Sequence, residues 1–272
     1  MTLRRTLSAL SALATLLLAC SAQAHVPFLK PNQFKVEHPR LQIESAFTEY
    51  PFQADFAMDS DGFVMVLPNG QVQALQPSAK TSAAVYLEPK LPEDGTYRIT
   101  TGVRKGPALK AIDVKGKLYF ADDVERMKGE KTQMRYYSRA DAYIAKGAPA
   151  YQARPLNDGV EIIPQSAPTE LLRGGSLVLQ VLRDGKPLPF ARLIVARDGE
   201  HYEHRRIEDL YDAENVRGSN IKADAQGMVT FTPPQAGLYF LLANTHERIN
   251  KDLWNSYNAE LTLEVGLPVL KK

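Results

Sequence analysis

The histidines are the residues of this sequence with the clearest capacity for chemistry, and His25 is the most informative of them. It directly follows Ala22-Gln23-Ala24, the small-x-small pattern that precedes a signal-peptide cleavage site. Cleavage after Ala24 gives His25 both a free α-amine and an imidazole. The α-amine has an ordinary pKa of about 8, so its deprotonation at neutral pH costs little free energy. His25 is therefore a predicted metal ligand; the alternative is that cleavage merely leaves it exposed.

A second candidate is the H-x-x-H pair formed by His201 and His204 in the charged segment 200–209 (EHYEHRRIED). Residues three apart on a strand face opposite sides of the sheet. The two imidazoles can therefore bind one ion only if the segment is a loop or a helical turn. The alternative is that both histidines are solvated on an exposed loop.

His246 follows a predicted strand at 238–243, and Glu247 could orient its imidazole or supply an oxygen ligand. We predict a metal site that combines His25 with one or two of His201, His204 and His246. The alternative for His246 is a hydrogen-bonded residue at a strand end. His38, which precedes Pro39 in a predicted turn, is assigned no role.

Residues 1–24 form a predicted signal peptide, with Arg4 and Arg5 before the apolar run 7–19. The run is too short for a membrane span. We therefore expect export to the periplasm. The alternative is a lipoprotein anchored through Cys20, because Leu17-Leu18-Ala19-Cys20 is an imperfect lipobox. Cleavage after Ala24 removes the one cysteine, which excludes disulfides and thiolate metal sites.

Composition narrows the functional class. Removing Arg4 and Arg5 from the 33 basic residues leaves 31, which equals the number of acidic residues. The sequence shows no basic stripe or acidic tail, so we expect no nucleic-acid partner. It contains no P-loop, G-x-G-x-x-G, G-x-S-x-G or H-E-x-x-H motif, and we assign no catalytic residue.

The 18 prolines and 17 glycines separate short apolar runs, which is typical of an all-β protein. We predict a first β domain at 25–105, where apolar residues alternate over 41–47 and run continuously over 63–67. Residues 106–155 are charged and rich in tyrosine, and we interpret them as a connecting arm or hairpin. Residues 156–268 form a second β domain. The predicted fold is two β-sandwiches joined by this arm.

The second domain carries a family resemblance. The segments 184–191 (DGKPLPFA), 223–231 (ADAQGMVTF) and 236–240 (AGLYF) match a turn-and-strand pattern of prealbumin-like and immunoglobulin-like repeats in exported proteins. Together with 161–164, 171–175, 135–139 and an initial His25, they make the chain resemble the DUF4198 family. Members are often described as periplasmic components of cobalt or nickel uptake, so the resemblance implies metal handling. Phe28 replaces the tryptophan of the family's frequent His-x-x-Trp start.

We therefore expect a periplasmic protein that binds a divalent transition metal (nickel, cobalt, copper or zinc) and presents or buffers it for an uptake system. The expected partner is a membrane metal transporter or an outer-membrane receptor, and we expect binding without turnover. Two alternatives remain open: a copper enzyme of the oxidase type that uses an amino-terminal histidine brace, and a metal-free immunoglobulin-like interaction module at the cell envelope.

Overall fold

The computed structural model describes residues 25–120, 128–203 and 220–268. The predicted signal peptide with Cys20, and His204, lie outside these ranges. Strands dominate the described residues, which otherwise hold a four-residue helix, α1 (Glu200–Glu203), and a 3-10 turn, η1 (Pro168–Glu170). The prediction of an all-β protein is confirmed.

The strands in chain order are β1 (Val26–Pro31), β2 (Lys35–Val36), β3 (Ile43–Thr48), β4 (Phe56–Ala57), β5 (Val64–Val66), β6 (Val72–Ala74), β7 (Pro77–Lys80), β8 (Val85–Leu87), β9 (Gly95–Thr100), β10 (Arg104–Val114), β11 (Lys117–Phe120), β12 (Glu130–Lys146), β13 (Val160–Pro164), β14 (Leu177–Arg183), β15 (Lys186–Pro187), β16 (Arg192–Arg197), β17 (Ile221–Lys222), β18 (Met228–Phe231), β19 (Gly237–Asn250) and β20 (Leu253–Val265).

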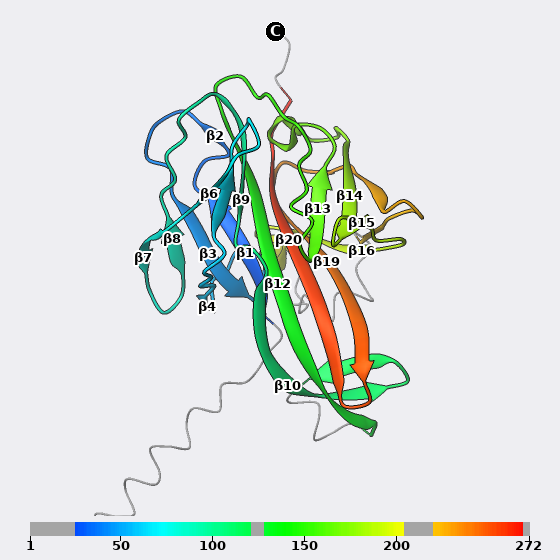
Figure 1. The fold of residues 1–272 in the computed structure, drawn as a ribbon. Coiled ribbons are helices and arrows are strands. Elements are labelled where there is room, and N and C mark those ends of the chain that lie inside the picture. Colours follow the sequence, from blue (N-terminus) through cyan, green and yellow to red (C-terminus); the bar gives the residue numbers. More distant parts are fainter. Residues whose placement is uncertain (1–24, 121–127, 204–219, 269–272) are drawn as a thin grey trace, which may run out of the picture.

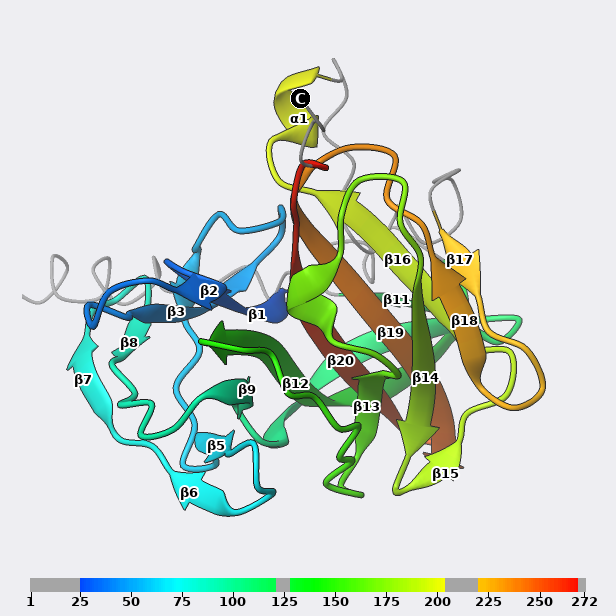
Figure 2. The same cartoon turned by 90° about the horizontal axis from the view of Figure 1, so that it is seen from above.

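These strands form three sheets. The first sheet has the order β1-β3-β8-β7, with β4 beside β3. The long sheet has eleven strands and the central order β17-β16-β19-β20-β12-β9-β5-β6. The third sheet contains β13, β14, β15 and β18. In Figure 2 the first and third sheets lie on either side of the long sheet, which both of them use as their partner layer.

Alternation along β12 explains how one sheet serves two cores. Ala140, Ala142 and Ile144 are buried in the core beneath the first sheet. Tyr143 belongs to the other core, beneath the third sheet. Successive side chains of a strand point to opposite faces, so β12 contributes to both cores at once. The first and third sheets therefore cover opposite faces of the long sheet.

The C-terminal core supports the predicted immunoglobulin-like sandwich. Leu179 and Val181 from β14 meet Leu241 from β19 and Leu261 from β20, and all four side chains are fully buried. They join two sheets face to face, an arrangement shared by immunoglobulin-like domains. The N-terminal core is built in the same way between the first sheet and the strands β9, β5 and β12.

The segment 106–155, interpreted from the sequence as a connecting arm or hairpin, contains most of the antiparallel pair β10 and β12, and β12 is a central strand of the long sheet. β12 occupies 17 of the segment's residues, pairs antiparallel with β9 and parallel with β20, and passes through the middle of the long sheet. Charged residues surround Ala140, Ala142 and Ile144 in the sequence, so the apolar alternation that indicates a buried strand is weak there. The two sandwiches are thus joined by shared hydrogen-bonded strands.

The long sheet continues beyond both sandwiches. Figure 1 shows β10, β12, β19 and β20 extending together past the cores and ending in a narrow tip. We call this extension, formed by residues 104–120, 128–137 and 246–257, the stalk. Its strands are held by the pairs Gln133↔Leu253 and Ile112↔Lys131, and by a hydrogen bond of 2.9 Å from the Gln133 amide to the Asp252 carbonyl.

A buried ionic network joins the sandwiches. Arg98 on β9 contacts Asp141 on β12 through two hydrogen bonds, of 2.8 and 3.2 Å, and donates a third, of 2.9 Å, to Glu161 on β13. Arg139 lies 3.6 Å from the same Glu161 carboxylate. All four side chains are at most 3% exposed, and their charges balance. Burial opposes the charge of Arg98, but Asp141 and then Glu161 outweigh it and raise the pKa of Arg98.

Glu260 is a further fully buried carboxyl group, on the face of β20 that meets β1. Its Oε1 accepts a hydrogen bond of 2.7 Å from the Thr262 hydroxyl, and its Oε2 has no hydrogen-bond partner among the described residues. Burial raises the pKa of Glu260 well above its ordinary value, and the nearby Asp141 charge adds to this, while Thr262 and the Leu29 amide oppose it. The neutral form of Glu260 is therefore favoured.

We expect Arg98→Met to lower the free energy of unfolding by about 3–5 kcal/mol, because it leaves Asp141 and Glu161 buried without their main counter-charge. Urea denaturation at pH 7 measures the change. The matched control is Lys35→Met, which removes an ion pair with Glu170 between half-exposed side chains and should cost about 1 kcal/mol or less. Equal losses in the two variants would contradict the structural role of the network.

The raised pKa of Glu260 predicts a pH dependence of stability. The folded protein holds the Glu260 proton more tightly than the unfolded chain does. This contribution is complete below the ordinary pKa of 4.5 and is lost as the pH rises through the folded-state pKa. Glu260→Gln should remove that decline, which amounts to at most about 1.4 kcal/mol per pH unit. The measurement is urea denaturation across this pH window, and an identical slope in both proteins would refute the prediction.

Candidate functional site

His25 lies immediately before β1, whose position is fixed on two sides. β1 pairs antiparallel with β3 in the register Val26↔Thr48, so His25 lies beside the loop that follows β3. Val26 and Phe28 are fully buried in a core that also contains Phe240 and Leu242 of β19. The amino end of the described chain is thus anchored by the residues directly after it.

The partners of His25 come from the loop between β3 and β4. Its Nε2 lies 3.4 Å from Oδ2 of Asp55 and 3.8 Å from Oε1 of Glu49. The Asp55 carboxylate is itself oriented by a hydrogen bond of 2.8 Å from the Glu49 backbone amide. The imidazole packs edge-on against Phe56, with 4.7 Å between ring centroids, and its side chain is only 10% exposed.

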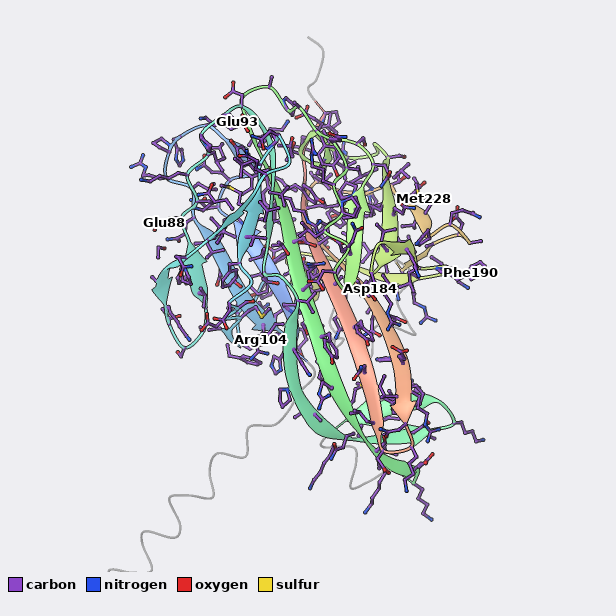
Figure 3. All side chains as sticks on the ribbon, viewed as in Figure 1. Glu88, Glu93, Arg104, Asp184, Phe190 and Met228 are labelled. Atoms are coloured by element: carbon purple, nitrogen blue, oxygen red, sulfur yellow. The ribbon has the colours of Figure 1, made fainter. Side chains whose placement is uncertain are left out.

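The His25 imidazole rests on a group of stacked aromatic rings. Phe56 stacks on Phe47 of β3 at a centroid distance of 5.0 Å. The Arg104 guanidinium lies 5.3 Å from the centre of the Phe47 ring, and Figure 3 shows Arg104 where the first sandwich meets the stalk. The imidazole therefore has an apolar neighbour on one side and two carboxylates on another.

The two carboxylates bear on the metal-binding chemistry of His25. An acceptor close to Nε2 favours the neutral tautomer that carries its proton there, which leaves the Nδ1 lone pair for a ligand. In an amino-terminal histidine, Nδ1 and the α-amine can close a compact chelate around one ion. The local geometry is therefore compatible with the predicted role of the amino end.

The other predicted ligands are placed differently. His246 lies on β19 opposite Ser256, on the face of the long sheet that also carries Phe240 and Leu242 and meets β1. It is exposed as a whole, although protein atoms around its ring desolvate it and lower its pKa. The His25 side chain contacts Glu49, Asp55 and Phe56 of the β3–β4 region.

His201 lies in α1, and His204 is outside the described residues. Within the described ranges, no group of three or more histidine, cysteine, aspartate or glutamate side chains is arranged to hold a metal ion. The joint site of His25 with His201, His204 or His246 stays a prediction.

Glu247 does not orient His246, contrary to the interpretation drawn from their adjacency. Its carboxylate accepts hydrogen bonds from Arg183 and, at 3.3 Å, from the Tyr257 hydroxyl. The hydrogen bond from Arg183 lowers the pKa of Glu247. Adjacent residues of a strand point to opposite faces, so Glu247 and His246 lie on different sides of the long sheet.

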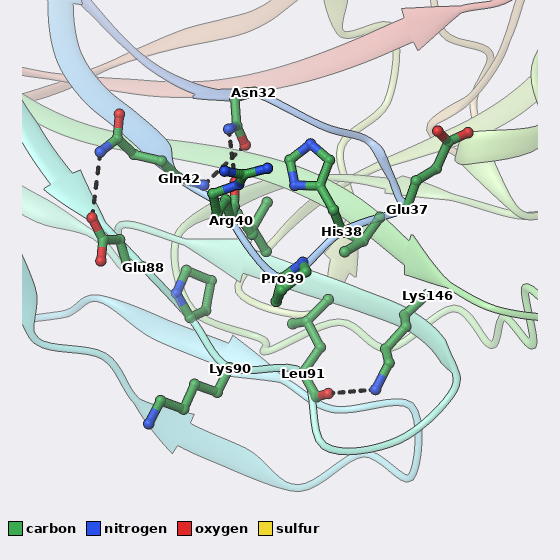
Figure 4. A pocket seen from close by; sticks show the side chains of 13 residues that line it. Asn32, Glu37, His38, Pro39, Arg40, Gln42, Glu88, Lys90, Leu91 and Lys146 are labelled. Atoms are coloured by element: carbon green, nitrogen blue, oxygen red, sulfur yellow. Dashed lines mark hydrogen bonds between the residues drawn. The ribbon is translucent and has the colours of Figure 1, made fainter.

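A cavity of about 810 Å³ lies at the edge of the first sandwich, and no motif in the sequence predicts it. Figure 4 shows His38, Pro39 and Arg40 on one side and Glu88, Lys90 and Leu91 on the other. Two side-chain amides stabilise the loop that carries His38. The Asn32 side chain donates a hydrogen bond of 2.9 Å to the Arg40 carbonyl, and the Gln33 side-chain nitrogen lies 3.2 Å from His38 Nδ1. The lining mixes both charge signs.

Comparison with known proteins supplies the family. The model of the family described as "Domain of unknown function (DUF4198)" matches residues 22–247, which include His25 and most of both sandwiches. The chain belongs to the DUF4198 family. This confirms the resemblance inferred from the turn and strand motifs, and the family description itself assigns no activity.

Other comparisons add little. The D0-D1 domain of intimin shares 10% identity, with 87% of this chain and 97% of that chain covered, at a TM-score of 0.21. The D00-D0 domain of intimin shares 13% identity over 88% and 99% of the two chains, at a TM-score of 0.20. Likenesses of this size carry no inference about function. No curated protein matches the chain, and no helix among the described residues has the length and apolarity needed to cross a membrane.

Proposed function

We propose that this protein binds a divalent transition-metal ion at the amino end produced by cleavage after Ala24. In this role it presents or buffers the ion in the periplasm for an uptake system, without turnover. The observation that carries the proposal is the position of the His25 imidazole, whose Nε2 faces the carboxylates of Asp55 and Glu49 at 3.4 and 3.8 Å.

The donor set follows from these contacts. The α-amine and Nδ1 of His25 supply two nitrogen ligands, and the carboxylate beside Nε2 fixes the orientation of the ring. Nitrogen ligands of this kind suit copper, nickel, cobalt and zinc. His201, His204 and His246 remain the proposed sources of a further imidazole.

A presenting role agrees with the small number of ligands. Two nitrogens from one residue leave coordination positions open, and an ion with open positions can be passed to a partner. A membrane metal transporter or an outer-membrane receptor is the proposed recipient. The burial of Val26 and Phe28 holds the chelating residue in place at the surface of the first sandwich.

Calorimetric titration with Cu²⁺, Ni²⁺, Co²⁺ and Zn²⁺ tests the proposal on protein that begins at His25. The matched control retains Ala24, which keeps every side chain but turns the α-amine of His25 into an amide. We expect the control to bind at least about 10-fold more weakly, because it loses one chelating nitrogen. Among the first three ions the affinity should follow Cu²⁺ > Ni²⁺ > Co²⁺. Asp55→Asn should weaken binding about 10- to 100-fold, whereas His38→Ala should leave it unchanged.

Equal affinity with and without Ala24 would overturn the amino-end chelate. Copper-dependent consumption of peroxide by the His25 protein would instead support the oxidase alternative. Binding no tighter than that of the His25→Ala variant for all four ions would favour a metal-free interaction module.

A further inference from the structure

The stalk differs in charge from the rest of the protein. Its described residues carry ten basic and four acidic side chains. The segment 121–127, which joins β11 to β12, lies outside the described residues and adds three acidic residues and one basic residue. The remaining chain after residue 24 has 20 basic and 24 acidic residues. The positive charge of a nearly neutral protein is therefore concentrated on one projecting element.

The lysines of the stalk tip are available to a partner. Lys115, Lys117 and Lys131 are exposed and form no ion pair with a described residue. Lys251, in the turn between β19 and β20, is 82% exposed and reaches Asp252 only at 4.0 Å. Among the basic side chains of the stalk, Arg248 has the nearest acidic partner within the stalk, with its Nη2 3.1 Å from Oε1 of Glu130.

The same tip carries apolar and aromatic groups. Ile249 is 47% exposed and lies next to the turn at 251–252. Trp254, on the neighbouring strand, is partly exposed, and the Arg248 guanidinium lies 5.6 Å from the centre of its ring. The Lys117 Nζ atom similarly lies 5.1 Å from the centre of the Tyr119 ring. Tryptophan and tyrosine with nearby basic groups are characteristic of the membrane–water interface.

From these observations we propose that the stalk tip docks onto a membrane surface that contains anionic lipids. Exposed lysines are attracted to such a surface, and Ile249 and Trp254 can enter the headgroup region. The stalk extends beyond both sandwiches (Figure 1), so its tip can reach a flat surface without a clash from either body. An exposed aliphatic side chain gains nothing from a soluble polyanion, which favours lipid over nucleic acid.

The experiment is co-sedimentation of the His25 protein with phosphatidylcholine vesicles prepared with and without phosphatidylglycerol. We expect binding only to vesicles that contain phosphatidylglycerol, and weaker binding as salt rises. Lys117→Glu combined with Lys251→Glu should lower the affinity at least about 25-fold, the effect of losing two basic contacts with an anionic surface. The charge-matched control is Lys90→Glu combined with Lys186→Glu, two exposed lysines outside the stalk, which should retain most of the binding.

Ile249→Ser separates a bilayer from a soluble polyanion. It should weaken vesicle binding while leaving retention on a heparin column unchanged, because heparin offers charge without an apolar layer. The thermal unfolding midpoint of each variant verifies that it folds. The proposal is overturned if the two double lysine variants lose the same vesicle affinity, or if the unmodified protein binds equally to vesicles with and without phosphatidylglycerol. It is also overturned if Ile249→Ser binds vesicles as tightly as the unmodified protein.

Discussion

The buried charges of Arg98, Arg139, Asp141 and Glu161 are the constraint on which the rest of this structure depends. They come from β9, β12 and β13, so they connect the N-terminal sandwich to the third sheet. Charges this far from water are tolerated only when they are paired and hydrogen-bonded, and the Glu161 carboxylate also accepts the backbone amides of Leu156 and Asn157 at 2.9 and 2.8 Å. The two sandwiches therefore have one relative placement that satisfies all four groups.

The shared long sheet positions both β1, which follows His25, and the stalk. Because successive side chains of β12 point to opposite faces, the first and third sheets cover opposite faces of one layer. β1 lies against this layer through Val26 and Phe28, which holds His25 at the start of an ordered strand. The same strands continue past both cores and form the stalk, where a single layer with basic side chains remains.

The proposed metal site and the proposed docking surface use different parts of this design. The His25 site depends on the β3–β4 loop, whose Asp55 and Glu49 carboxylates give the imidazole its orientation. The stalk tip depends on its concentration of positive charge, on the exposed Ile249 and on the partly exposed Trp254, with no contribution from those carboxylates. A protein that holds an ion at one place and a lipid surface at another would keep its cargo near a membrane partner.

The all-β class, most of the C-terminal sandwich, the family and the choice of His25 as a candidate ligand could all be inferred from the sequence alone. Turns and alternation are local properties, and segments such as 184–191 specify them directly. The pairing of the strands is visible only in the folded structure, because alternation indicates the face on which a side chain lies but not the strand that pairs with it. Asp55 and Glu49 reach His25 only through the β1–β3 register. Asp141 and Glu161, which the sequence presents as ordinary charged residues, became the buried link between the sandwiches because distant strands enclose them.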